Sequence, residues 1–241
     1  MPISAVNSRV KLSPRLSLTA SMVRDSSRVV DVGCDHGKLL AWLITSGRCI
    51  YAYAVDISRP SLKKATDLFV ELAIQDRVQS ICADGLDDVS SDDVDDIVIA
   101  GLGSDTIERI ISRAPWLKDS NKHLILVPSS RHAQLRRYIY SEGYEIIKEE
   151  AVEDASHCYT VMSVRYSGVV KHISNSFAAI GKICESAGAK DRYLEQTYMR
   201  AVSLISKIQH AKEYDITVVA EVTEVAEYIE DILKGGKTAN D

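Results

Sequence analysis

The alternation of short apolar runs with amphipathic segments between residues 27 and 143 constrains the fold of this chain more than any other feature. Five runs of strand length occupy residues 27–34, 49–58, 77–86, 95–103 and 122–130. Apolar residues at helical spacing occupy residues 12–23, 37–47, 58–74, 104–117 and 131–143. Ser104 or Asp105 is the expected N-cap of the fourth of these helices. Strands that alternate with helices predict an α/β protein whose parallel sheet is covered on both faces.

The pattern changes after residue 143. Residues 144–154 and 159–168 both have the composition of strands, and no helical segment separates them. They predict an antiparallel pair at one edge of the sheet, which distinguishes Rossmann-like class I methyltransferase sheets from those of dinucleotide-binding proteins. From about residue 169 only helical spacing remains, which indicates three helices or a kinked hairpin. We therefore expect a methyltransferase domain at 1–168 and a helical, coiled-coil-like domain at 169–241.

The composition is that of an ordinary globular protein. Apolar residues make up 46% of the 241 residues and charged residues 26%. The apolar runs are far shorter than the roughly 20 residues of a membrane-spanning helix, and the first residues lack the apolar stretch of a secretion signal. We expect a cytoplasmic protein without a membrane partner. Five scattered cysteines without CxxC spacing indicate neither a disulfide framework nor a metal site.

Acidic and glycine residues gather where the first four expected strands end. In chain order these strand ends supply Asp31 and Gly33, then Asp56, then Asp84 and Gly85, and finally Gly101 and Gly103. The turn after the first strand also holds Asp35, His36 and Gly37. Ligands of open α/β sheets bind at the carboxyl ends of the strands. These residues therefore predict a ligand site along one rim of the sheet.

The acids in the turn indicate which ligand this is. Asp31 and Asp35 would repel the pyrophosphate of a dinucleotide, but they would attract the ammonium and sulfonium charges of S-adenosylmethionine (SAM). Asp56 lies 19 residues after Gly37 and is placed to accept the ribose hydroxyls, and Asp84 can accept the adenine amino group. We expect SAM as the cofactor. The residues expected to bind it are Asp31, Gly33, Gly37, Asp56, Asp84, Gly85 and Gly101.

Several stretches of the chain, all in one order, resemble those of a known family. They are LSPRL at 12–16, DVGCDHGKL at 31–39, ADGL at 83–86, IAGLGSDTI at 99–107, LILVPSSRHAQLRRYI at 124–139 and EGYEIIKEEAVEDASHCYTVM at 142–162. Over nearly all of residues 11–168 the chain resembles the bacterial tRNA methyltransferases that act on N1 of adenine 22. The resemblance implies SAM-dependent methylation of tRNA and a helical second domain that aids tRNA binding. Lys38 and Ser104 depart from the family, which usually has tyrosine and glycine there.

The loop after the fourth strand, AGLGSD at 100–105, has no aromatic residue. Enzymes that methylate exocyclic amines place a (D/N)PP(Y/F) loop here, so this loop does not suit that reaction. N1 of adenine has a free lone pair, and its methylation requires alignment and stabilisation of a cationic product. We expect Asp35 and His36 to be catalytic, with Asp105 as an alternative source of the stabilising charge. A histidine that only caps the helix or bridges to Asp35 is the structural alternative for His36.

N1 lies on the Watson–Crick edge, so a paired adenine must be flipped out before it reacts. The basic residues expected to hold the surrounding RNA are Arg15, Arg131, Arg136, Arg137 and the lysines of 171–212. Arg15 and Arg131, together with Gly103 and Asp105, are the expected substrate-binding residues, whereas Arg136 and Arg137 could equally form an exposed helix face. Two other functions remain open: methylation of a different substrate, and binding without catalysis by a Rossmann-like module. The spacing in the tail fits a monomer or a homodimer.

Overall fold

The computed structural model describes residues 10–185, 188–210 and 215–235 of the chain. Seven strands form one sheet in the order β3-β2-β1-β4-β5-β7-β6. The strands are β1 (Ser27–Val32), β2 (Cys49–Asp56), β3 (Val78–Cys82), β4 (Asp96–Ala100), β5 (His123–Val127), β6 (Tyr144–Asp154) and β7 (His157–Tyr166). The first five strands are parallel, and β7 pairs antiparallel with both β5 and β6. This arrangement confirms the parallel sheet and the antiparallel edge pair predicted from the sequence.

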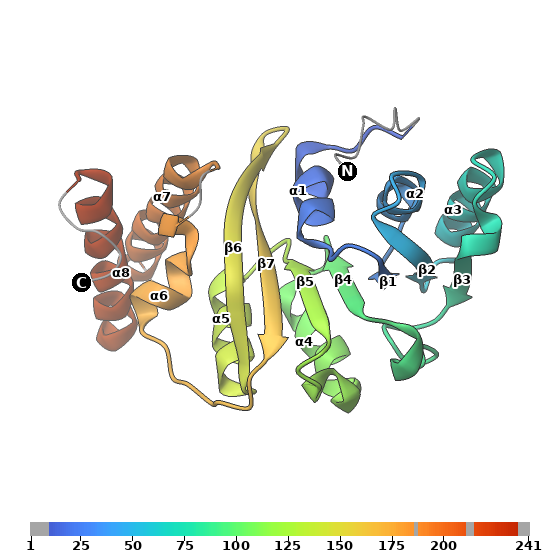
Figure 1. Cartoon of the computed structure of the whole chain (residues 1–241). Coiled ribbons are helices and arrows are strands. Elements are labelled where there is room, and N and C mark those ends of the chain that lie inside the picture. The colour runs from blue at the N-terminus through green and yellow to red at the C-terminus, as the bar shows by residue number, and fades with distance from the viewer. Residues whose placement is uncertain (1–9, 186–187, 211–214, 236–241) are drawn as a thin grey trace.

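Helices cover both faces of this sheet (Figure 1). The helices α1 (Pro14–Met22), α2 (Lys38–Thr45) and α3 (Arg59–Glu71) lie on one face, and α4 (Ser104–Arg113) and α5 (His132–Ser141) on the other. Successive residues of β1 show why two cores form: Val29 packs with the first group of helices and Val30 with the second. Side chains alternate between the faces of a strand, and burial on both faces explains why the parallel strands are continuously apolar.

The segment after β7 is helical, as expected. It contains α6 (Asn175–Ile180), α7 (Lys190–Gln209) and α8 (Ile216–Leu233), which lie beside the β6–β7 edge of the sheet (Figure 1). Ile180, Leu194 and Ile229 bring one buried residue from each helix into a common apolar cluster. The second half of α7 is less buried than its apolar spacing suggested, because Val202 stays exposed. The division into two domains near residue 168 remains a prediction.

A buried ion pair joins α5 to this helical segment. The side chains of Arg136 and Glu149 are both 0% exposed, and Arg136 Nη2 lies 2.7 Å from Glu149 Oε1. Arg136 also donates to the carbonyl oxygens of Ala178 and Ala179 and to the hydroxyl of Tyr193. The expectation that Arg136 contacts RNA phosphate, or lies on an exposed helix face, is therefore wrong. The pair satisfies its own hydrogen-bonding groups and fixes α6 and α7 against the sheet.

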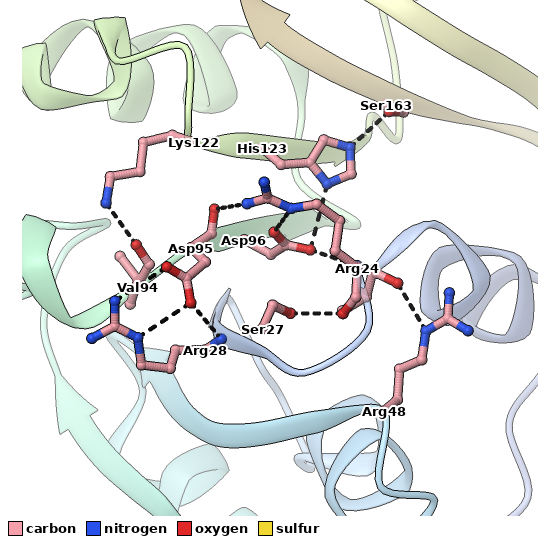
Figure 2. Close-up of polar contacts among 11 residues, drawn as sticks. Arg24, Ser27, Arg28, Arg48, Val94, Asp95, Asp96, Lys122, His123 and Ser163 are labelled. Carbon is pink, nitrogen blue, oxygen red and sulfur yellow. Dashed lines mark hydrogen bonds and ion pairs between the residues drawn. The ribbon is translucent and has the colours of Figure 1, made fainter.

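Polar side chains also cluster at the amino ends of the central strands (Figure 2). Asp96, at the start of β4, accepts from the backbone N–H of Arg24 at 2.7 Å and from its Nε at 2.6 Å. Nδ1 of His123 lies 3.4 Å from Asp96, and its Nε2 lies 2.7 Å from Ser163 Oγ. This cluster connects the segment before β1 to β4, β5 and β7.

No helix in the described part of the chain is long and apolar enough to cross a membrane.

Candidate cofactor and substrate site

A cavity of about 400 Å³ lies at the carboxyl ends of β1 and β4. These two strands are adjacent, and the chain leaves them in opposite directions across the sheet, toward β2 and β5. This is the switch point at which open α/β sheets bind their ligands. Its lining consists of Arg15, Leu16, Asp31, Gly33, Cys34, Asp35, His36, Lys38, Leu39, Ala100, Gly101 and Leu102. Six of the expected site residues therefore meet here, four from β1 and the turn that follows it, together with Arg15 and Gly101.

The turn between β1 and α2 adopts left-handed backbone conformations at three positions. Gly33 has φ +76°, Asp35 +49° and Gly37 +67°. A Cβ atom at Gly37 would lie 2.6 Å from Phe69 and 2.8 Å from Ala65, so this glycine allows α2 and α3 to pack closely. At Asp35, which is not a glycine, the backbone N–H donates to Asp56 Oδ2 at 3.2 Å. The turn is thus tied to the end of β2.

Asp31 is the buried acid of the cavity, with 4% of its surface exposed. Burial, followed by the nearby charges of Asp56 and Asp35, raises the pKa of Asp31 to about 7. Among the described residues Asp31 has no basic ion-pair partner, although its side chain faces a cavity. A buried carboxylate of this kind is ready to pair with a cationic group of a ligand.

Asp56 and Asp84 lie at their expected strand ends, but neither lines the cavity. Asp56 accepts from the backbone N–H groups of Asp35 and Ser58, so it organises the turn and the start of α3. Asp84 pairs with Arg109 and Arg113 of α4, and their hydrogen bonds lower its pKa to about 2. The neighbouring Gly85 has φ +74°, and a Cβ atom there would lie 3.0 Å from Ile110. The cofactor roles of these residues remain predictions.

His36 lines the cavity, and its side chain is about half exposed. Its Nε2 is 3.3 Å from Nζ of Lys64 and 3.5 Å from Oδ1 of Asp35. Lys38 lines the same cavity from the first turn of α2. The structure therefore brings the two expected catalytic residues together and places two lysines beside them.

The loop after β4 is held by its own polar groups. Gly103 is the N-cap of α4 and Ser104 is its first residue, so the expectation that Ser104 or Asp105 caps this helix is wrong. The hydroxyl of Ser104 is buried and donates to the carbonyl oxygens of Ser130 and Arg131. This contact fixes the β4–α4 loop to the β5–α5 loop, and serine performs this task where a glycine could not.

Asp105 and Arg131, both expected to bind substrate, face each other across these two loops. Arg131 Nη1 donates to Asp105 Oδ2 at 2.6 Å, and Gln134 donates to Asp105 Oδ1 at 2.7 Å. The Gln134 hydrogen bond and the Arg131 charge lower the pKa of Asp105. Both partners of the ion pair are largely exposed, so a polar ligand could exchange with either one.

Residues 12–162 match a family model described as a methyltransferase domain. The chain belongs to this methyltransferase family. The tRNA (adenine(22)-N(1))-methyltransferase of Bacillus subtilis (strain 168) is 26% identical over 153 residues, which cover 64% of this chain and 64% of that protein. This chain therefore matches just under two thirds of the length of that relative.

Two solved structures resemble this methyltransferase along most of its length. The B. subtilis M1A22 tRNA methyltransferase TrmK gives a TM-score of 0.81 at 20% identity, covering 93% of this chain and 100% of the other. M. capricolum TrmK in complex with the cofactor product S-adenosyl-homocysteine gives 0.75 at 20% identity, covering 94% and 99%. At this identity the two comparisons establish a common fold, which includes the helical segment after the sheet.

One exposed apolar residue at the rim of the sheet was not predicted from the sequence. Ile57 of the methyltransferase directly follows Asp56 at the end of β2, and 74% of its surface is exposed. A large apolar side chain that remains open to solvent beside a ligand site suits the face of a nucleobase. Its position in the sequence could have indicated this, since an apolar residue that follows the last acid of a buried strand lies on the rim of the sheet.

A second cavity of about 460 Å³ lies between α5 and the helices α7 and α8 of the methyltransferase. Arg131, Arg137 and Arg200 line it together with apolar residues of both helices. His132 also lines it, and burial together with the Arg136 charge lowers the pKa of this histidine to about 4. The positive charge of the cavity at pH 7 therefore comes from the three arginines.

Proposed function

We propose that this methyltransferase transfers a methyl group from SAM to N1 of an adenine in tRNA, with adenine 22 as the target. The observation that carries the cofactor part of the proposal is the buried Asp31, which has no ion-pair partner in the described part of the chain and lines a cavity at the switch point of the sheet. The B. subtilis relative, named as a tRNA (adenine(22)-N(1))-methyltransferase, supports the choice of base and nucleotide. A protein that modifies tRNA works where tRNA is found, so we place it in the cytoplasm.

The residues of the cavity suit SAM. Its volume, about 400 Å³, lies within the range of small-molecule sites. Asp31 can bind the ammonium group, Asp56 and the exposed Ile57 are available to the ribose and the adenine ring, and Gly33 and Gly101 keep the floor of the cavity free of side chains. When bound, SAM supplies an electrophilic methyl group on a positively charged sulfur.

The protein must then hold the adenine in line with that methyl group and stabilise the positive charge that the base acquires. Asp35 is the candidate for the second task, because its exposed carboxylate borders the cavity and lies in a strained backbone conformation fixed by Asp56. His36 is placed to hydrogen-bond the base. No proton has to be removed from N1 before the reaction, so neither residue needs to act as a base.

The RNA would be held by the arginines between the sheet and the helical segment. Arg131, Arg137 and Arg200 all line the second cavity, between α5 and α7. The lysines of 171–212 are further candidates for phosphate contacts, although Lys212 lies outside the described residues. A flipped nucleotide and its flanking phosphates require basic groups of this kind.

The test is methyl transfer from labelled SAM to tRNA, followed by nuclease digestion and identification of the labelled nucleoside. We expect 1-methyladenosine from a tRNA with adenine at position 22 and no product from the same tRNA with guanine there. The variant Asp31→Ala should abolish labelling. Label in another nucleoside, or equal label in both tRNAs, would contradict the assignment of the base or of the position. Absence of label together with tight SAM binding would leave a methyltransferase for another substrate, or a protein that binds the cofactor without catalysis.

A further inference from the structure

Arg15 occupies an unusual position in the cofactor cavity. It is the second residue of α1, whose N-cap Ser13 accepts from Leu16 and donates to Asp154 Oδ2 at 2.5 Å. The backbone N–H of Arg15 lies 3.4 Å from the same carboxylate oxygen. Because Asp154 ends β6, the start of α1 is fastened to the antiparallel edge of the sheet. The backbone of Arg15 is therefore fixed before any ligand binds.

The side chain of Arg15 is fixed as well. Its guanidinium carbon lies 4.9 Å from the ring centroid of Tyr159 on β7, a cation–π contact. On the cavity side, a Cβ atom at Gly101 would lie 3.3 Å from Nη1 of Arg15, so the guanidinium rests directly against the glycine that follows β4. Any larger residue at position 101 would push the arginine aside. The guanidinium is thus held between an aromatic ring and the floor of the cavity.

Despite this, the guanidinium makes no hydrogen bond to any residue that the structure describes. Nε of Arg15 is buried and has no hydrogen-bond partner among the described residues. Within the same part of the chain, its side chain forms no ion pair with the cavity acids Asp31 and Asp35, although all three line one cavity. A buried donor without a partner costs free energy, and an anionic ligand would remove that cost. The planar fork of arginine suits a carboxylate in particular.

The charges around Arg15 decide which anion fits. A phosphate of RNA would have to enter a cavity that also contains Asp31 and Asp35, and both would repel it. An α-amino acid group carries an ammonium and a carboxylate on one carbon, and it needs an acid and a base on the wall of the same cavity. Asp31 and Arg15 are such a pair, provided by β1 and α1. The amino-acid end of SAM has this chemistry.

We propose that Arg15 binds the carboxylate of the methionyl group of SAM and so makes this site specific for a cofactor that carries it. The inference rests on the proposed use of SAM. It replaces the expectation that Arg15 contacts an RNA phosphate. Arg15 then positions the cofactor, with Tyr159 and Gly101 as the residues that hold its guanidinium in place, and it takes no part in the methyl transfer.

The experiment compares two ligands on each of several full-length proteins by isothermal titration calorimetry. The ligands are SAM and decarboxylated SAM, which keeps the ammonium, the sulfonium and the adenosine but lacks the carboxylate. We expect the wild-type protein to prefer SAM by about 10- to 100-fold, the usual size of a charge-assisted hydrogen-bonded contact. Arg15→Gln should bind both ligands with the low affinity that the wild type has for decarboxylated SAM. Arg15→Lys, which keeps the charge without the fork, should show an intermediate preference.

Arg165→Gln is the matched control, because Arg165 is an exposed arginine on β7, the strand of Tyr159. It should keep the wild-type preference. The preference is a ratio measured on one protein, so a partly unfolded variant still reports it. Equal affinity of the wild type for both ligands, or an unchanged ratio in Arg15→Gln, would overturn the inference. Failure of the wild type to bind SAM at all would instead overturn the proposed function.

A second measurement separates the carboxylate from RNA phosphate. Binding of tRNA without cofactor should be the same for the wild type and for Arg15→Gln. A weaker tRNA affinity combined with an unchanged SAM preference would show that Arg15 contacts the nucleic acid.

Discussion

The two ends of the central strands both contain a buried aspartate, and the two residues are in opposite situations. Asp96, at the amino end of β4, is 0% exposed and is met by Arg24 and His123 (Figure 2). Asp31, near the carboxyl end of β1, is 4% exposed and has only further acids, Asp56 and Asp35, as the charged groups that shift its pKa. The two strands are neighbours in the sheet. The difference therefore comes from the groups that surround each acid and not from depth in the fold.

This comparison separates a structural from a functional buried charge. A paired buried acid connects elements of the fold, and the free energy of its desolvation is offset by its partners. An unpaired buried acid destabilises the protein that contains it, and its presence at a cavity indicates a ligand with the complementary charge. Arg136 and Glu149 belong to the first class, since each satisfies the other inside the protein. Asp31 belongs to the second, and Arg15 with its unpartnered Nε is its basic counterpart.

The largest effect is expected for Asp31→Asn. Loss of the carboxylate should weaken SAM binding by about 100-fold or more, because the ammonium of the ligand loses its buried partner. The same change should stabilise the ligand-free protein. The folded-state pKa of Asp31, about 7, lies above its ordinary value of 3.8, so the charged form opposes folding and stability falls as the pH rises between these values. At pH 8 the gain in the free energy of unfolding should be up to about 4 kcal/mol.

Calorimetric titration with SAM and urea unfolding at pH 8 measure the two effects on the same samples. A variant that is less stable than the wild type and binds SAM normally would show that Asp31 is a structural acid like Asp96.

Asp96→Asn is the matched substitution at the other end of the sheet. It should lower the free energy of unfolding by about 2–3 kcal/mol, because Arg24 and His123 lose a charged acceptor inside the protein. SAM affinity, measured at a temperature where the variant is folded, should stay within about twofold of the wild type, an estimate that follows from the separation of the two clusters along the strands. A loss of affinity comparable to that of Asp31→Asn would mean that the two ends of the sheet are coupled.

Most of the fold could be predicted from the sequence because it depends on local patterns. Buried parallel strands are continuous apolar runs, and the absence of a helix between residues 144–154 and 159–168 was sufficient to predict the antiparallel edge. The exact start of α4 was not predictable, since Ser104 is a good N-cap by residue type. Its hydroxyl instead bonds to Ser130 and Arg131, which are distant in sequence. Arg136 was misjudged for the same reason, because its partners Glu149 and Tyr193 come from other elements.

The candidate site was predictable as a set of positions but not as a set of contacts. Strand ends are recognisable in a sequence, so Asp31, Asp35 and Gly101 could be assigned to one rim. The pairing of Asp84 with Arg109 and Arg113 depends on which face α4 turns toward β3, and spacing alone does not show this. The position of Arg15 depends on Asp154 and Tyr159, about 140 residues later in the chain. Only the folded structure shows that an N-terminal arginine completes a site made by β1 and β4.

The smallest expected effect is the pH dependence of cofactor binding, and it sharpens the contrast between the two aspartates. Asp31 must be charged to pair with the ammonium of SAM, and burial, together with the neighbouring acids Asp56 and Asp35, raises its pKa to about 7 in the free protein. Binding below pH 7 therefore requires release of a proton. SAM affinity should rise about fivefold between pH 6.0 and 7.5, less than the tenfold per unit limit because the α-ammonium of the ligand begins to titrate in this range. Titrations in buffers of different ionisation enthalpy would also reveal the released proton.

His36→Gln should retain the rise, because Asp31 is the titrating group, and Asp31→Asn should lose it. A rise that disappears in His36→Gln would assign the proton to the imidazole, and the buried acid of β1 would then be charged in the free protein despite its surroundings.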